Sequence, residues 1–167
     1  RIPSAERVKR SLELVQKPEK EIGHTEWIFA KEIVLLDALI AKWPEEEVEV
    51  QAIQVGPAVF ISNPAEYFVE YGLEIKQRSN FKLTWIVELA NGCAGYVPTE
   101  EALGPKGGGY ETRLTSYSNL EVGAGRKFLE AGLTLANQLT PGKLPVPPRA
   151  PPWSAPWSYG NVPPETK

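Results

Sequence analysis

Three oxygen-bearing side chains lie where strands are predicted to end or loops to turn: Glu66, Tyr96 and Tyr110. Glu66 follows Asn63-Pro64, and this spacing predicts a helix start in which Asn63 is the N-cap and Glu66 closes a capping box. A carboxylate at that position also suits the helix dipole. The alternative is functional, because a strand-to-helix junction projects a carboxylate into the cleft at strand ends where α/β proteins bind ligands.

Each of the two tyrosines follows a glycine-containing segment. Tyr96 ends the segment Asn91-Gly92-Cys93-Ala94-Gly95-Tyr96, which predicts a close turn directly after a strand. Its phenol is either a half-buried aromatic with a hydrogen-bonded hydroxyl or a ligand. Tyr110 follows Gly107-Gly108-Gly109, which lacks the Lys-Ser/Thr end of a phosphate-binding loop and predicts a flexible loop or a lid that positions Tyr110.

The other reactive residue types are expected to have structural or solvent-exposed roles. Cys93 has no basic neighbour and no nearby His, so we expect a small buried thiol. The single His, His24, precedes a helical segment and is expected to be exposed or to cap that helix. One His cannot form a His-rich metal site by itself. Glu45, Glu46 and Glu47 predict a solvated turn.

The amino-acid composition limits the classes of protein to which the chain can belong. The chain of 167 residues has 18 Lys plus Arg against 21 Asp plus Glu, a net charge of −3, and 42% apolar residues, which is typical of one soluble globular domain. The mild acidity argues against nucleic-acid binding. One Cys excludes an internal disulfide framework. No apolar run reaches the roughly 18–20 residues of a membrane span, and no signal peptide opens the chain.

Hydrophobic periodicity predicts the elements that must position these residues. Helices are expected at 4–16 with Ser4 as cap, at 25–43 with Thr25 as cap, at 63–78 and at 122–139; strands are expected at 48–53, 58–61 and 81–89, and a long loop at 91–119. This order predicts the α/β class, a layered sheet with covering helices. The helix at 25–43 is apolar on nearly every face, which predicts burial against a further layer.

The chain divides at about residue 140. Residues 1–140 are predicted to form the folded unit, and 141–167 a Pro/Trp-rich extended tail. Nine of the 16 prolines lie between Pro141 and Pro164, with Trp153, Trp157 and Tyr159 as expected anchors. The chain begins at Arg1 and contains no Met, so we expect a processed protein or a piece of a longer one.

From Ala52 to about Leu139 the chain resembles the C-terminal part of the catalytic domain of neutral (alkaline, non-lysosomal) ceramidases. The resemblance rests on four elements in the family's order: the strand pair Ala52-Ile53-Gln54-Val55-Gly56 and Ala58-Val59-Phe60-Ile61; Asn63-Pro64-Ala65-Glu66, similar to a Pro-Gly-Glu turn; Asn91 to Tyr96 with Val97-Pro98-Thr99, similar to an Asn-x-x-x-x-Tyr segment; and Gly109-Tyr110-Glu111, similar to a Tyr-Glu element. It covers roughly half of the chain. The tail does not match the immunoglobulin-like domain of well-known ceramidases.

The resemblance implies a zinc-dependent amidase acting on the N-acyl bond of ceramide or a related amphiphilic substrate. It implies that Glu66 and Tyr96 are zinc ligands and that Tyr110 helps hold the scissile carbonyl oxygen. The family's other two ligands are histidines from its N-terminal half, so an N-terminal portion or companion chain is the expected partner. Relatives act at cell surfaces or outside the cell, which implies an extracellular or periplasmic location.

Two alternatives stay open. In one, the chain is a non-catalytic interaction or structural module on a ceramidase-like scaffold; Ala65, the absent histidines and the Pro/Trp tail favour this interpretation. In the other, the same zinc chemistry cleaves an ester or lactone.

Overall fold

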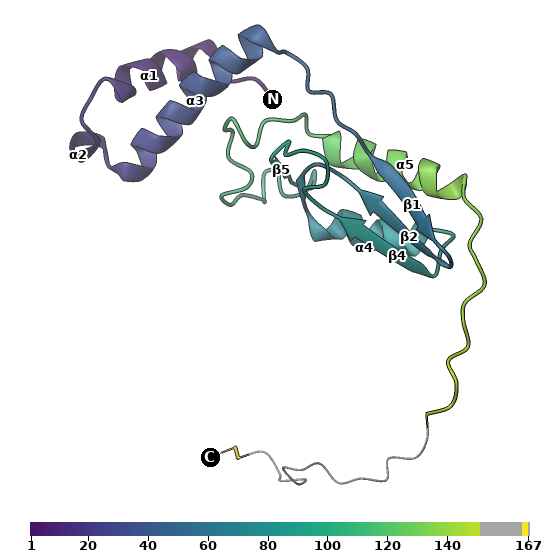
Figure 1. The fold of residues 1–167 in the computed structure, drawn as a ribbon. Helices are drawn as coiled ribbons and strands as arrows, with labels where there is room; N and C mark the ends of the chain where they lie inside the picture. The colour runs from purple at the N-terminus through teal and green to yellow at the C-terminus, as the bar shows by residue number, and fades with distance from the viewer. Residues whose placement is uncertain (151–164, 167) are drawn as a thin grey trace.

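A computed structural model describes residues 1–150 and 165–166 of the chain, and within residues 1–150 it has a mixed α/β fold (Figure 1). The elements are α1 (Ala5–Val15), α2 (Glu19–Ile22), α3 (His24–Lys42), β1 (Gln51–Val55), β2 (Ala58–Ser62), β3 (Glu66–Tyr67), α4 (Val69–Arg78), β4 (Leu83–Val87), β5 (Tyr96–Val97) and α5 (Ala124–Asn137). The predicted α/β class is confirmed. The anchors proposed at Trp153, Trp157 and Tyr159 lie outside the described residues.

The N-terminal helices form a hairpin in which α1 packs along α3 (Figure 1). Ser4 caps α1 as predicted, because its hydroxyl accepts a hydrogen bond from the Arg7 amide at 3.2 Å. The predicted cap of the second helix is wrong. α3 starts at His24 with Gly23 as its N-cap, so Thr25 already lies within the helix.

A three-stranded sheet occupies the centre of the chain, in the order β1-β2-β4. β1 and β2 form an antiparallel hairpin, and β4 pairs with β2 in parallel. The inner face of this sheet carries Val59 and Ile61, which belong to the main hydrophobic core. The helices α4 and α5 supply the other side of that core, with Tyr71, Phe128 and Leu129 buried between helix and sheet.

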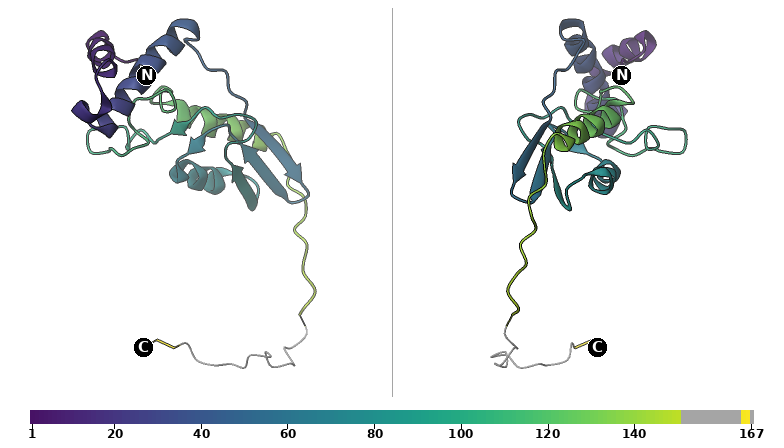
Figure 2. Two further views of the ribbon diagram at one scale, coloured as in Figure 1. Left: turned by 60° about the vertical axis from the view of Figure 1, so that its left-hand side comes forward. Right: turned by 90° about the vertical axis from the view of Figure 1, so that its right-hand side faces the viewer.

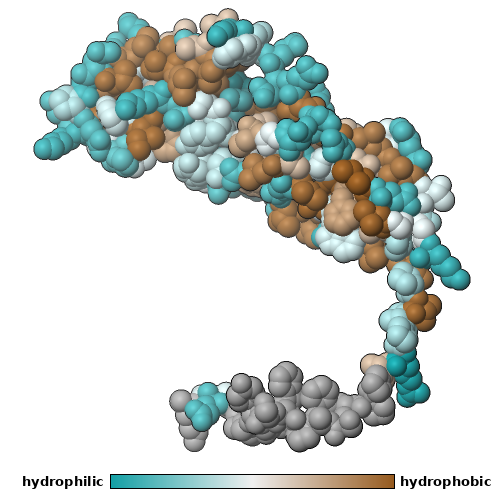
Figure 3. Space-filling view, in the orientation of Figure 1, coloured by the Kyte–Doolittle hydropathy of each residue, from teal (hydrophilic) through white to brown (hydrophobic). Residues whose placement is uncertain are grey.

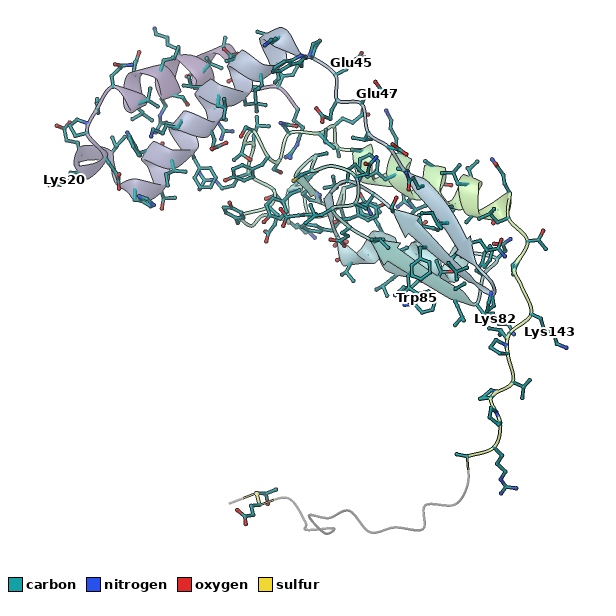
Figure 4. All side chains as sticks on the ribbon, in the orientation of Figure 1. Lys20, Glu45, Glu47, Lys82, Trp85 and Lys143 are labelled. Carbon is teal, nitrogen blue, oxygen red and sulfur yellow. The ribbon has the colours of Figure 1, made fainter. Side chains whose placement is uncertain are left out.

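The other side of the sheet, which we call the outer face, is largely apolar, and no helix within residues 1–150 covers it (Figures 1 and 3). Its large apolar side chains are Ile53, Val55, Phe60, Leu83, Trp85 and Val87. Phe60 and Trp85 stack at 5.2 Å between ring centroids, and Figure 4 marks Trp85 on this face. The strand predicted at 81–89 is present but shorter, and Leu83, Trp85 and Val87 share one face as alternation requires, whereas Phe81 lies in the core. Its apolar side nevertheless faces outward, with Trp85 44% and Val87 39% exposed, while Thr84 and Ile86 face the core.

The predicted helix start at Asn63-Pro64 is wrong. The Asn63 side chain accepts a hydrogen bond from the Ala65 amide at 3.1 Å and so closes a turn instead of capping a helix. The backbone after this turn is already hydrogen-bonded to segments next to β4 and β5. The Leu89 amide donates to the Ala65 carbonyl, and the Glu66 amide donates to the Gly95 carbonyl. The chain therefore stays extended through β3, and α4 begins only at Val69.

A long loop separates β5 from α5, as the sequence predicts, and α5 itself lies within the expected 122–139. The loop lies against the helical hairpin and closes on itself at a tight turn between Thr115 and Ser118 (Figure 2). After α5 the chain crosses the β1–β2 turn, where the Gly142 amide donates to the Gly56 carbonyl at 3.2 Å. Among the described residues, no helix has the length and apolar character needed to span a bilayer.

Candidate functional site

The parallel pair β3–β5 places Glu66 and Tyr96 directly opposite each other in register. The next residues along each strand, Tyr67 and Val97, are 5% and 2% exposed and belong to the hydrophobic core. Because successive strand side chains point to opposite sides, Glu66 and Tyr96 both point away from that core. The structure therefore brings together the two residues named as zinc ligands, although Glu66 lies on a strand and not at a helix entrance.

The two side chains interact electrostatically. Hydrogen bonding between the Tyr96 phenol and the Glu66 carboxylate is the main cause that raises the pKa of Tyr96, followed by partial burial and the charge of Glu66. An ionised phenol would put a second negative charge beside the carboxylate, so the protonated form is favoured. A carboxylate and a phenol aimed at each other are two oxygen donors that one cation could share.

Tyr110 joins this pair from the glycine-rich loop. Its ring lies edge-on to the Tyr96 ring, with 5.8 Å between centroids and an interplanar angle of 83°. The side chain is 52% exposed, and Phe29 of α3 approaches it at 6.3 Å between ring centroids. All three candidate residues therefore lie in one cluster, and Tyr110 is its most exposed member.

Tyr117 completes the cluster, and sequence reasoning missed it. Its hydroxyl lies 3.0 Å from the Tyr110 hydroxyl, and its ring lies 6.3 Å from that of Tyr96 between centroids. Burial, followed by the hydrogen bond with Tyr110, raises the pKa of Tyr117 to about 12. Tyr117 lies within a stretch that the sequence marks only as a loop, and no local pattern distinguishes its phenol from any other half-buried tyrosine.

Carboxylates give the cluster a negative field. The charges of Glu66 and Glu111 both favour the protonated form of Tyr96, and the charge of Glu32 acts in the same way on Tyr117. Such surroundings attract cations and repel phosphates. Within residues 1–150 and 165–166, no group of three or more His, Cys, Asp or Glu side chains could hold a metal ion.

The remaining candidates lie apart from the cluster. His24 is exposed and contacts Glu19 at 2.7 Å between Nδ1 and Oε1, as expected for a surface His. The prediction of a buried Cys93 is wrong, because Cys93 is exposed on the surface loop that joins β4 to β5. Glu45, Glu46 and Glu47 are exposed, in agreement with a solvated turn.

No protein-family profile, curated protein or solved structure matches this chain.

Proposed function

We propose that this chain is the C-terminal portion of the catalytic domain of a zinc-dependent, ceramidase-like hydrolase that cleaves an N-acyl amide bond. The observation that carries this proposal is the register of β3 and β5, which sets Glu66 beside Tyr96 with both side chains turned away from the core. Tyr110 lies against the same pair. These are the three residues, in the same roles, that the ceramidase resemblance implies.

The donor chemistry of the pair fits zinc in part. Glu66 and Tyr96 supply one carboxylate and one phenolic oxygen, and a catalytic zinc site needs at least one further protein ligand. We propose that an N-terminal portion or a companion chain supplies two histidines. Bound zinc would polarise the scissile carbonyl and lower the pKa of a water molecule.

The residues of this chain would then hold the cation and orient the substrate. Tyr96 must give up its proton to act as a ligand, and because its pKa is raised, cation binding should strengthen as the pH increases. Tyr110, half-exposed at the edge of the cluster, is placed to donate a hydrogen bond to the oxygen on which negative charge develops. The amphiphilic substrate, the extracellular or periplasmic location and the extended Pro-rich tail remain parts of this proposal.

The test is zinc content and amidase activity of the complete natural protein with Glu66→Ala and Tyr96→Phe. We expect either change to weaken zinc binding by more than about 100-fold, because loss of an outer-shell partner alone costs 10–100-fold. The readouts are equilibrium zinc titration and hydrolysis of a fluorogenic ceramide analogue. Glu70→Ala removes an exposed carboxylate from the first turn of α4 and Tyr71→Phe removes a buried phenol, and these matched controls should bind zinc normally. Unchanged zinc affinity in both ligand variants would remove the proposal.

One observation favours the second candidate, a non-catalytic interaction module. The outer face exposes Ile53 at 53%, Val55 at 61% and Trp85 at 44%, and exposed apolar patches mark interaction surfaces. A complete protein that binds no zinc and hydrolyses no N-acyl substrate would support this candidate. If zinc is bound but only esters or lactones are cleaved, the third alternative holds, and parallel assays on amide, ester and lactone substrates distinguish the two hydrolases.

A further inference from the structure

The turn that carries Tyr117 is held from several directions. The Arg1 guanidinium donates to the Ser118 carbonyl at 2.7 Å and to the Ser118 hydroxyl at 2.8 Å. The Glu32 carboxylate of α3 accepts a hydrogen bond from the Ser116 amide at 3.2 Å. Thr115 and Ser118, which bracket the turn, are fully buried. Tyr117 therefore extends from a rigid support.

The same turn is joined directly to the proposed ligand strand. The Tyr96 amide donates to the Tyr117 carbonyl at 2.8 Å. Gly95, with a φ of 77°, allows this approach, because a Cβ atom there would lie only 2.1 Å from the Tyr117 carbonyl oxygen. The position of Tyr117 relative to Tyr96 is thus fixed through the backbone.

Tyr110 is supported differently from Tyr117, by contacts of its side chain. It follows three consecutive glycines, of which Gly108 and Gly109 have φ values of 139° and 113°. Its ring makes edge contacts with Phe29 and Tyr96, and its hydroxyl contacts the hydroxyl of Tyr117 at 3.0 Å. Of the two phenols, Tyr110 is the more exposed, with 52% of its surface accessible.

We infer that Tyr117 is a positioning residue, which fixes the Tyr110 hydroxyl while the Tyr110 ring lies against Tyr96, and which donates a hydrogen bond to that hydroxyl when Tyr110 donates to the substrate oxygen. This inference rests on the role of Tyr110 in the proposed hydrolase. In the free chain the hydroxyls of Tyr110 and Tyr117 share one hydrogen bond, with 3.0 Å between the oxygens. A hydroxyl both donates and accepts, so rotation of the two O–H bonds reverses the direction without moving either ring. The result is a chain of two hydrogen bonds that ends on the developing oxyanion, in which each bond polarises the next.

The first experiment is a double-mutant cycle in the complete, zinc-loaded protein with Tyr110→Phe, Tyr117→Phe and both changes. Hydrolysis of a fluorogenic ceramide analogue gives kcat and KM separately. We expect Tyr117→Phe to lower kcat on the order of tenfold with KM unchanged, as for the loss of one transition-state hydrogen bond. In the Tyr110→Phe background it should lower kcat no further. Tyr71→Phe is the matched control and should leave kcat unchanged.

The second experiment needs no activity. In the metal-free chain labelled with 13Cζ-tyrosine, Tyr117→Phe should shift and broaden the Tyr110 resonance and leave those of Tyr67 and Tyr71 in place. Equal losses from Tyr117→Phe in the wild-type and Tyr110→Phe backgrounds, or an unmoved Tyr110 resonance, would overturn the inference. If Tyr110→Phe itself keeps full activity, the proposed function fails in its oxyanion role, which is a different result from the failure of Tyr117 alone.

Discussion

Gly95 is the residue on which the geometry of the candidate site most depends. Tyr96 can meet both Glu66 and Tyr117 because the backbone at Gly95 passes close to the Tyr117 carbonyl with a positive φ. An L-amino acid with a side chain meets two penalties there, the strained φ and the overlap with a carbonyl oxygen.

We expect Gly95→Ala to destabilise the chain by on the order of 2 kcal/mol or more and to separate Tyr96 from Tyr117. Urea denaturation measures the free energy of unfolding, and the 13Cζ resonances of the two tyrosines report their separation. Gly123→Ala is the matched control, since a Cβ atom at Gly123 meets nothing within 4 Å. Equal stability of the two variants would show that the close approach is not needed.

At the residue scale, the sequence predicted which side chains would be candidates better than how they would be positioned. Glu66, Tyr96 and Tyr110 are recognisable from their types and order. Tyr117 is not, because its importance arises from a contact between backbone groups 21 positions apart, the Tyr96 amide and the Tyr117 carbonyl. The exposure of Cys93 was also mispredicted, since burial of a short loop depends on what packs over it.

Among the elements, α4 and α5 are tied together at the surface by four charged side chains. Arg78 contacts Glu130 at 2.6 Å and Glu74 at 2.8 Å, and Arg126 contacts Glu74 at 2.7 Å. Hydrogen bonds to these arginines lower the pKa values of Glu74 and Glu130. The network links α4 to α5 at the solvent-exposed surface of the two helices.

Replacing Arg78 with Met should lower the thermal midpoint modestly, because the pairs are solvent-accessible and screened by salt. The two carboxyl pKa values are lower in the folded chain. The stabilisation is therefore present above the ordinary Glu value of 4.5 and is lost as the pH falls through the folded values. Calorimetry from pH 7 to pH 3 should show the midpoints of wild type and variant converge at the acid end. Lys76→Met, a charge change on the same helix, is the control, and a pH-independent difference would contradict this account.

Hydrophobic periodicity predicted which longer helices and strands exist, but it did not predict which strands pair with one another. The strand at 81–89 and the helix at 122–139 were predictable because their patterns are long. The helix start at Asn63 was mispredicted because a local capping signal competes with pairing to Leu89 and Gly95, which are distant in sequence. Likewise, β3 and β5 are two residues each, too short for any periodic signal, yet their pairing creates the candidate site.

The whole molecule has two unlike sides. On one side α4 and α5 cover the sheet, and on the other the outer face presents Trp85, Phe60 and Ile53 (Figures 1 and 3). Glu66 and Tyr96 also point away from the core that α4 and α5 cover. Both the outer face and the candidate site are therefore directed away from that core.

An exposed apolar sheet face promotes association. We expect the isolated chain to self-associate as its concentration rises, and Trp85→Lys to reduce this association severalfold by placing a charge on the outer face. Sedimentation velocity over a concentration series measures the effect. Leu73→Lys changes a residue of α4 that is 59% exposed but lies outside the outer face, and it should associate like the wild type. Equal effects of both substitutions would indicate general charge repulsion.

The crossing of Gly142 over the β1–β2 turn determines how the chain can be tethered. This turn precedes β2, whereas Glu66 follows it, so the two lie at opposite ends of a strand that is roughly 13 Å long. A bead, sensor chip or fused protein attached beyond Gly142 would hold the chain by the end remote from the tyrosines. Immobilisation in that orientation leaves the acid–phenol pair directed toward bulk solution, where a metal buffer or an added polypeptide can reach it.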